Sequence, residues 1–409
     1  MRLTAIAKLI DIFTPDRTRT YALLTMMFGC LVVISSFVES PERLTGGTDF
    51  PAFYNAGRIL NEYSGKSLYD RELQRRLYLE VAPNAAIRRN LFFVYTPFFA
   101  LVFAPLASLP YVPAFVCWIL ISIGLFMVGF WLAWTAASLP TEHRLNGFVL
   151  ALAFLPFLTW CLFTGQTSAF GFFWLALAIY LDRKGWLFAS GCALAVLLYK
   201  PTLLILLVPM LIVTKRWRSL AGFCVTATGL GLVSLAMVGF SGLPAYLSML
   251  ASFSQDKASG KHPNWADVDA FSFFLPLVNG RVSLARGLVA ALGIVVMPFL
   301  LAVWMRRPER AWAHAITWTL VLNIYVLIYD ATFIILAVLL SIEPLILSQR
   351  QLPLSFRWLL LALFLVPWVE TNMALNYGFH PMTVVLVAFG CYQLFGTLRG
   401  QHATLLNAR

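Results

Sequence analysis

Long apolar stretches alternate with short basic segments along most of the chain. Twelve of these stretches approach the length of a membrane-spanning helix, and they lie at 21–38, 111–137, 146–163, 168–181, 186–199, 202–214, 219–240, 287–304, 311–329, 331–347, 357–371 and 381–398. A helix needs about 20 apolar residues to cross the hydrocarbon core of a bilayer. The pattern predicts an all-α polytopic membrane protein with twelve spans, built as one integral domain over residues 1–409.

The connections between these stretches differ in charge, and the difference predicts an orientation. Basic residues occur in alternate connections, at Arg17 and Arg19, Arg144, Arg183 and Lys184, Lys215, Arg216 and Arg218, Arg306, Arg307 and Arg310, Arg350, and Arg399. Lys and Arg accumulate in loops on the cytoplasmic side. We therefore expect both termini in the cytoplasm and two long outer loops, about 39–110 and 241–286. Three prolines interrupt 93–110, which we interpret as an outer-surface element instead of a span.

Composition supports the membrane assignment and excludes other classes. Hydrophobic residues make up 60% of the chain, charged residues only 12%, and the mean hydropathy is +0.80, values far from those of soluble domains. The net charge of +12 follows from the basic loops, so we expect no nucleic-acid partner. The six cysteines all lie in apolar stretches and show neither a metal-ligand spacing nor a disulfide framework. The first apolar stretch lacks a cleavage site and is expected to be an anchor.

The polar segment TDFPAFYNAGR (48–58) stands out between the first two apolar stretches. Pro51 favours a helix start, and the spacing of the apolar residues predicts a helix over 51–63 that lies along the membrane. Asp49 either caps this helix or acts as a general base. Arg58 either binds a phosphate or carboxylate or is a solvated surface charge. Tyr54 and Asn55 are candidates for sugar or acceptor binding.

Three further polar residues occur at predicted outer turns. Lys200 in LLYKPTLL either extends to the membrane surface or binds a phosphate. Gln166 in GQTS could bind sugar hydroxyls or satisfy a helix end, and Asp330 could bind a sugar, pair with Lys200 or cap a helix. Tyr95 in FVYTPFF is a further candidate for sugar binding.

The second outer loop contains SQDKASGKHPNWADVDAFSF (254–273). His262, Trp265, Asp267 and Asp269 are candidate sugar-binding groups, although a mobile lid or a solvated loop would use the same residues. The two aspartates could hold a divalent ion, but two carboxylates alone favour this weakly. The sequence has no His/Cys metal motif, phosphate-binding glycine loop or serine-nucleophile elbow. We expect no cofactor and do not favour a metal.

At these residues the chain resembles the GT-C glycosyltransferases, specifically the family 87 group that includes mycobacterial polyprenol-phosphate-mannose-dependent mannosyltransferases. The resemblance lies in DFPAFYNAGR with LYDRELQ, in YTPFFALVFAPLASLP, in GQTS, and in LYKP followed by KRWR. It extends over most of residues 45–218 and weakens beyond. The family usually shows two prolines after the tyrosine of YTPFF, and here Thr96 replaces the first.

The resemblance implies a GT-C fold with an active site on the outer face of a bacterial plasma (inner) membrane. The donor would be a polyprenyl-phosphate-linked hexose such as mannose, and the acceptor a lipid or glycan hydroxyl. Asp49 would deprotonate that hydroxyl, and transfer would invert the sugar. Arg58 or Lys200 would stabilise the phosphate leaving group.

Two other classes of membrane protein remain as alternatives. A transporter or flippase usually carries charges or broken helices near the bilayer centre, whereas the ionisable residues here fall at predicted helix ends. A lipid-linked glycan polymerase or ligase usually carries its essential residues in a large late loop, whereas the strongest polar cluster here follows the first span.

Overall fold

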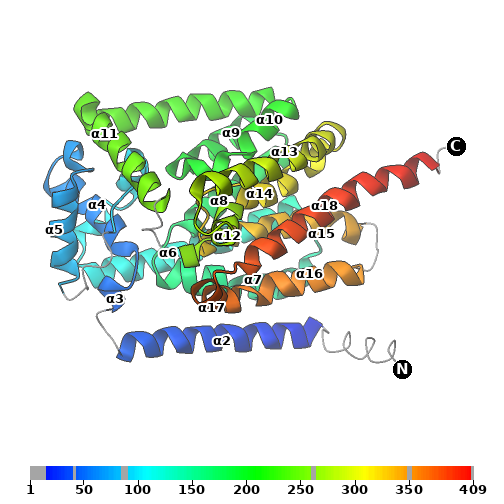
Figure 1. Cartoon of the computed structure of the whole chain (residues 1–409), viewed down its shortest axis with the longest axis horizontal. Helices are drawn as coiled ribbons and strands as arrows, with labels where there is room; N and C mark the ends of the chain where they lie inside the picture. Colours follow the sequence, from blue (N-terminus) through cyan, green and yellow to red (C-terminus); the bar gives the residue numbers. More distant parts are fainter. Residues whose placement is uncertain (1–14, 40–42, 84–90, 259–263, 348–351, 407–409) are drawn as a thin grey trace.

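A computed structural model describes residues 15–39, 43–83, 91–258, 264–347 and 352–406, and the described chain is helical (Figure 1). The described residues contain no strand, only an isolated bridge between Asp267 and Leu327. In Figure 1 the first turns of α2 (Pro15–Glu39) and the last turns of α18 (Pro381–Leu406) lie at one end of the molecule. The short helices α3 (Arg43–Gly46), α4 (Phe50–Glu62) and α5 (Arg71–Val81) lie at the other.

Fewer helices can span a membrane than the sequence pattern predicted. Six described helices are long and apolar enough: most of α2, α6 (Tyr111–Ala136), the segment 217–253 of α11 (Trp217–Ala258), α13 (Val282–Arg306), the segment 328–346 that contains most of α15 (Ile334–Leu347), and most of α18. Two bent pairs raise the number to eight. They are α7 (Arg144–Leu152) with η6 (Pro156–Phe163), bent by 56°, and α16 (Leu354–Leu365) with α17 (Pro367–Tyr377), bent by 64°. The prediction of twelve spans is therefore wrong.

The four surplus stretches form helices that are too short. They are α8 (Ser168–Arg183), α9 with η7 (Leu187–Tyr199), η8 with α10 (Pro201–Val213), and α14 (Ala311–Val321), which is 11 residues long. Helices of 11 to 16 residues extend only about 16–24 Å at 1.5 Å per residue. The hydrocarbon core is about 30 Å thick. The apolar composition of these four stretches correctly predicted that they avoid water. It did not predict a span, because neighbouring helices can cover an apolar helix as well as lipid can.

Two helical hairpins are built from these short elements. The first runs up α9 and η7, reverses at Lys200 and returns along η8 and α10, and its two ends meet where Arg216 forms an ion pair with Asp182 (3.2 Å). The second runs up α14 and returns along α15. Its two arms meet at the same end of the bundle, because Arg183 binds both the Glu309 carbonyl (3.3 Å) and the Glu343 carboxylate (2.8 Å). The hairpin tips therefore both point to the opposite end.

The first predicted outer loop folds into short helices that pack on one another. The predicted helix 51–63 is confirmed as α4, and 93–110 contains the short helices η3 (Pro97–Val102) and η4 (Leu106–Ser108) instead of a span. Phe50 and Phe53 on α4 are fully buried, and Phe53 stacks on Phe103 with ring centroids 5.0 Å apart. A side chain at Gly57 would lie 2.5 Å from the Phe103 carbonyl oxygen. The glycine of the NAGR segment therefore permits the close approach of α4 to this loop.

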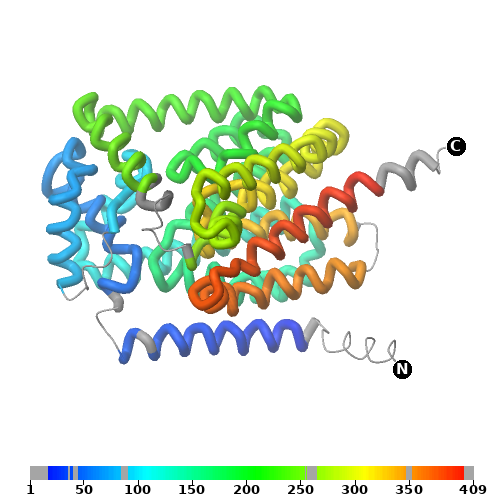
Figure 2. The backbone as a smooth tube through the Cα atoms, viewed as in Figure 1, coloured from blue at the N-terminus to red at the C-terminus, as the bar shows by residue number. Residues whose placement is uncertain are grey.

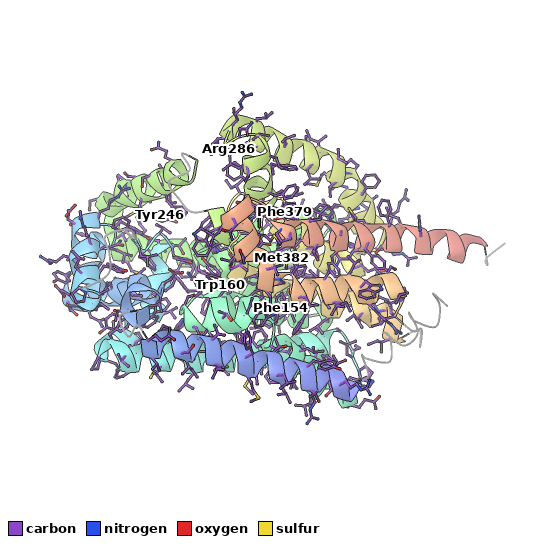
Figure 3. All side chains as sticks on the ribbon, turned by 60° about the horizontal axis from the view of Figure 1, so that its bottom comes forward. Phe154, Trp160, Tyr246, Arg286, Phe379 and Met382 are labelled. Carbon is purple, nitrogen blue, oxygen red and sulfur yellow. The ribbon has the colours of Figure 1, made fainter. Side chains whose placement is uncertain are left out.

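The second predicted outer loop is largely helical. α11 continues to Ala258 but breaks at Gly239, whose φ of +67° is accessible mainly to glycine. Beyond the break the helix turns back toward the middle of the molecule (Figure 2). η9 (Asn264–Ala266) and α12 (Ala270–Leu277) then lead into α13. Figure 3 draws the side chains of these helices and labels Tyr246 of α11 and Arg286 of α13.

Candidate functional site

Asp49 and Gln166 are joined across the first loop and the turn before α8. Gln166 Nε2 donates a hydrogen bond to Asp49 Oδ2 at 2.6 Å, and Asp49 N donates to the Thr164 carbonyl at 2.8 Å. Asp49 stands at the N-cap of α4, yet its side chain makes no capping hydrogen bond. The carboxylate is thus oriented by Gln166 and not by the helix backbone. Gly165, with φ +72°, packs directly on Phe50 and holds the two segments together.

Lys200 and Asp330 occupy the tips of the two hairpins and form an ion pair. Their side chains are 5% and 1% exposed. Asp330 also accepts hydrogen bonds from Ser168 Oγ (3.1 Å) and Leu327 N (3.2 Å). The Lys200 ammonium lies 5.1 Å from the ring centroid of Tyr325, where a cation is attracted to the ring face. Lys200 therefore does not extend to solvent, and of the interpretations of Asp330 the pairing with Lys200 is the one observed.

Tyrosines that are buried or partly buried connect the two pairs. Tyr95 stacks on Tyr199 with ring centroids 6.0 Å apart, and its carbonyl accepts a hydrogen bond from Tyr69 Oη (2.6 Å). Burial raises the pKa of Tyr95, and the nearby Asp330 and Asp49 carboxylates raise this pKa further. The pKa of Tyr325 is raised for the same reason, with Asp267, Asp330 and Asp49 all contributing. Gln166 binds Asp49, and Ser168, two residues further on, binds Asp330, so the turn before α8 places the two carboxylates around one site.

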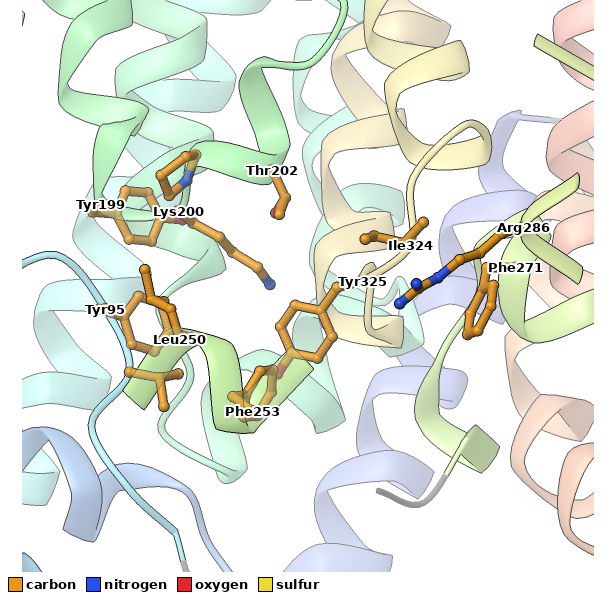
Figure 4. A pocket seen from close by; sticks show the side chains of 12 residues that line it. Tyr95, Tyr199, Lys200, Thr202, Leu250, Phe253, Phe271, Arg286, Ile324 and Tyr325 are labelled. Carbon is orange, nitrogen blue, oxygen red and sulfur yellow. The ribbon is translucent and has the colours of Figure 1, made fainter. Parts of the chain in front are cut away.

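A pocket of about 190 Å³ opens beside this ion pair (Figure 4). Its walls are mostly apolar and aromatic. Three of its polar side chains come from different elements: Lys200 at the first hairpin tip, Thr202 on η8 and Arg286 on α13. Arg286 is exposed and, among the described residues, has no hydrogen bond or ion pair; the Thr202 hydroxyl is buried and likewise unpartnered. Sequence reasoning missed both residues. Arg286 lies just before the predicted span 287–304, and Thr202 is the first residue of the predicted span 202–214.

The other candidates on α4 have different surroundings. Arg58 donates to both carboxylate oxygens of Glu62 (2.7 and 2.9 Å) and to Glu80 (3.0 Å). Tyr54 donates its hydroxyl to the Leu109 carbonyl (2.8 Å). Asn55 is 3% exposed, and neither end of its amide has a partner among the described residues. The predicted binding roles of these three residues stay predictions, and Asn55 is the one whose polar side-chain atoms are both buried without a hydrogen-bond partner among the described residues.

The second-loop candidates are partly structural. Asp269 caps α12 through Ser272 N (2.8 Å) and binds Val326 N (2.8 Å) with its other oxygen. Asp267 is fully buried and forms the backbone bridge to Leu327. Trp265 lies 5.7 Å from Trp160, centroid to centroid. His262 lies outside the described residues.

Metal binding gains no support from these contacts. The described residues contain no group of three or more His, Cys, Asp or Glu side chains placed to hold an ion. Both oxygens of Asp269 bind backbone amides, so the DVD segment does not present its two carboxylates as a pair of free ligands. The expectation that no metal is required stays a prediction.

Comparison with known protein families identifies the chain. The sequence model of glycosyltransferase family 87 matches residues 93–328, more than half of the chain. The chain belongs to glycosyltransferase family 87. No curated protein and no solved structure matches it. The family 87 region contains Tyr95, Gln166, Lys200 and Arg286, whereas Asp49 precedes it and Asp330 lies two residues beyond its end.

Family membership confirms the resemblance drawn from the sequence motifs. This family 87 protein is a membrane glycosyltransferase, so a sugar donor and an acceptor follow. A transport function is no longer needed to account for the polar residues at one end of the bundle. The matched region also reaches well beyond residue 218, where the recognisable motifs ended.

Proposed function

We propose that this family 87 glycosyltransferase moves a hexose such as mannose from a polyprenyl-phosphate-sugar to a hydroxyl of a lipid or glycan acceptor. The reaction takes place on the outer face of the plasma membrane, with both termini in the cytoplasm. The observation that carries the proposal is the Asp49–Gln166 hydrogen bond beside the Lys200–Asp330 pair. Together these bonds assemble an oriented carboxylate, buried charge and aromatic walls at one end of a membrane bundle.

Asp49 serves as the general base in this proposal. Its side chain makes no capping hydrogen bond to the α4 backbone, and Gln166 Nε2 donates to its Oδ2. This hydrogen bond holds the carboxylate in one orientation, and a general base must lie within hydrogen-bond reach of the proton that it removes.

The bond changes are those of a single displacement. The acceptor oxygen attacks the anomeric carbon while its proton passes to Asp49. The bond from that carbon to the phosphate oxygen breaks on the opposite face, which inverts the sugar, and the lipid phosphate leaves with the electron pair. Positive charge develops on the sugar ring, and the aromatic walls of Tyr95 and Tyr325 provide faces against which it can lie.

Lys200 and Asp330 act as a neutral unit in this scheme. The pair joins the two hairpin tips and fixes the position of the Tyr325 ring, which the Lys200 ammonium faces. Because Asp330 neutralises the ammonium, Lys200 contributes less to phosphate binding than a free cation would. Its predicted role as a phosphate ligand therefore becomes mainly one of positioning.

Donor chemistry provides the test. The sequence has no phosphate-binding glycine loop, which favours a lipid carrier over a nucleotide sugar. Purified protein should transfer label from polyprenyl-phosphate-mannose, or from another polyprenyl-phosphate hexose, to a native lipid extract. A nucleotide sugar supplied without a lipid carrier should not be used. Robust transfer from the nucleotide sugar alone would refute the proposal.

A further inference from the structure

The pocket beside the hairpin tips contains one cation whose charge is not balanced. Lys200 and Arg286 both line it. Asp330 pairs with Lys200, but Arg286 has neither an ion pair nor a hydrogen bond among the described residues. The pocket therefore has a net positive charge that is located on the guanidinium of Arg286.

A second polar group in the same pocket also has no partner. The Thr202 hydroxyl is buried and makes no hydrogen bond with described residues, although the Thr202 carbonyl accepts one from Asn323 Nδ2 (2.8 Å). A buried hydroxyl left unpaired costs about 1–3 kcal/mol. Figure 4 shows the Thr202 and Arg286 side chains on the same side of the Lys200–Tyr325 contact. Both groups can donate to an anion that enters here.

The rest of the pocket suits a lipid chain. Leu250, Phe253, Phe271 and Ile324 supply apolar lining, and Leu250 and Ile324 are 37% and 46% exposed. Arg286 stands in the second turn of α13, a candidate span, which is the depth of lipid headgroups for a helix that crosses a bilayer. An anion attached to a hydrocarbon chain matches both features.

We propose that Arg286, assisted by the Thr202 hydroxyl, binds the phosphate of the lipid-linked donor and stabilises it as the leaving group. This inference rests on the proposed function and reassigns phosphate recognition from Arg58 and Lys200, whose charges are already paired with carboxylates. The donor phosphate has one negative charge as a diester. When its bond to the sugar breaks, the phosphate gains a second negative charge, which a guanidinium binds through two parallel hydrogen bonds.

Binding is tested with farnesyl phosphate added to the purified full-length protein, which needs no knowledge of the natural donor. Farnesyl phosphate should raise the thermal midpoint. Farnesol, inorganic phosphate and phosphatidylglycerol at equal concentration should have much smaller effects. Arg286→Gln should weaken farnesyl phosphate binding at least about tenfold. Thr202→Val, which keeps the shape, should weaken it by a smaller factor.

Arg281 provides the matched control, because it is exposed, stands at the N-cap position of the same helix without a side-chain capping hydrogen bond, and does not line the pocket. Arg281→Gln should bind farnesyl phosphate like the wild type. Equal binding by Arg286→Gln and wild type would overturn the inference, as would an equal loss in both arginine variants. Equal effects of phosphatidylglycerol and farnesyl phosphate would do the same, because they would indicate a general headgroup site.

Catalysis supplies the second readout. With a polyprenyl-phosphate-sugar that the wild type uses, Arg286→Gln should lower kcat by about 10²–10³, the usual cost of removing one group that stabilises developing charge. The KM for the donor should rise and the KM for the acceptor should not, and Arg286→Lys should recover part of the loss.

If the wild type binds farnesyl phosphate through Arg286 but transfers no sugar, the proposed function fails and the binding site stands. If the wild type transfers sugar and Arg286→Gln matches it, the inference alone fails.

Discussion

Lys200 and Asp330, 130 residues apart in the sequence, form a buried ion pair that joins the tips of two helical hairpins. Neither hairpin arm that ends at Lys200 is long enough to cross the membrane. The pair therefore brings two short elements together at the depth where the sugar site is proposed. It also explains how a lysine can lie 5% exposed inside such an apolar bundle.

Removing one partner of this pair should cost more than removing both charges. Lys200→Met leaves the Asp330 carboxylate buried without its cation, and Asp330→Asn leaves the ammonium unpaired, so each should lower the free energy of unfolding by about 3–5 kcal/mol. The double variant Lys200→Met/Asp330→Asn should be more stable than the sum of the single effects predicts, because it leaves no unpaired buried charge. Its asparagine oxygen can still accept hydrogen bonds from Ser168 Oγ and Leu327 N. Denaturant titration in micelles measures the coupling, and additive effects within about 0.5 kcal/mol would argue against a true pair.

Asp49→Asn separates catalysis from structure. The asparagine oxygen can still accept the Gln166 hydrogen bond, but the variant has no base, so activity should fall by about 10²–10⁴ with little change in thermal midpoint. Asp70→Asn is the matched control, because Asp70 caps α5 through Glu72 N and Leu73 N (3.0 and 3.1 Å) and asparagine caps about as well. That variant should keep full activity. An active Asp49→Asn enzyme would move the search for the base to Asp267, Asp269 or Asp330.

Membrane orientation can be measured with single cysteines in a cysteine-free background. Ser64 lies beside α4 at the end of the molecule with the proposed site, and Arg218 lies at the end where the hairpins begin; both are exposed. An impermeant maleimide added outside intact cells should label Ser64→Cys and miss Arg218→Cys. The reverse pattern would place the site in the cytoplasm and refute the proposed outer-face reaction.

High pH should destabilise the protein through buried phenols. Burial raises the pKa of Tyr69, Tyr95 and Tyr325 above the ordinary value of 10.0. Below pH 10 these groups stay protonated in both states, so the full stability remains. Above it the unfolded chain releases protons that the folded chain keeps, and the free energy of unfolding falls by up to about 1.4 kcal/mol per pH unit for each group.

Thermal midpoints measured from pH 8 to 11 test this expectation. Tyr69→Phe loses a hydrogen bond to the Tyr95 carbonyl and should be less stable at neutral pH, but its stability should fall less steeply above pH 10. A slope equal to that of the wild type would mean that Tyr69 ionises normally in the folded protein.

The sequence predicted much of the architecture but not the number of spans. Hydropathy located the apolar helices correctly, and the helix at 51–63 followed from its proline and aromatic spacing. Hydropathy could not distinguish lipid from neighbouring helices as the source of burial. α14 therefore resembled a span, although it has 11 residues and is buried in the bundle throughout.

The site was predictable in its polar residues and not in their pairing. Asp49, Gln166, Lys200 and Asp330 could be selected because polar residues at apolar helix ends are unusual. Their partners depend on which turns meet in three dimensions, which no local spacing encodes. The partners of Arg58 are close in the sequence by comparison. Glu62 lies one helical turn away and Glu80 lies on α5, so the nearby chain already supplies the anions that bind Arg58.

The 130-residue separation of Lys200 and Asp330 also bears on how the chain assembles in the membrane. The first hairpin is synthesised well before Asp330, the residue that neutralises Lys200, so until then the lysine should lie near water or lipid headgroups. Once the second hairpin has been synthesised, Asp330 can pair with Lys200 and the two tips can pack together. Chains that end before Asp330 should consequently leave the Lys200 charge of the first hairpin without the carboxylate that neutralises it in the complete fold.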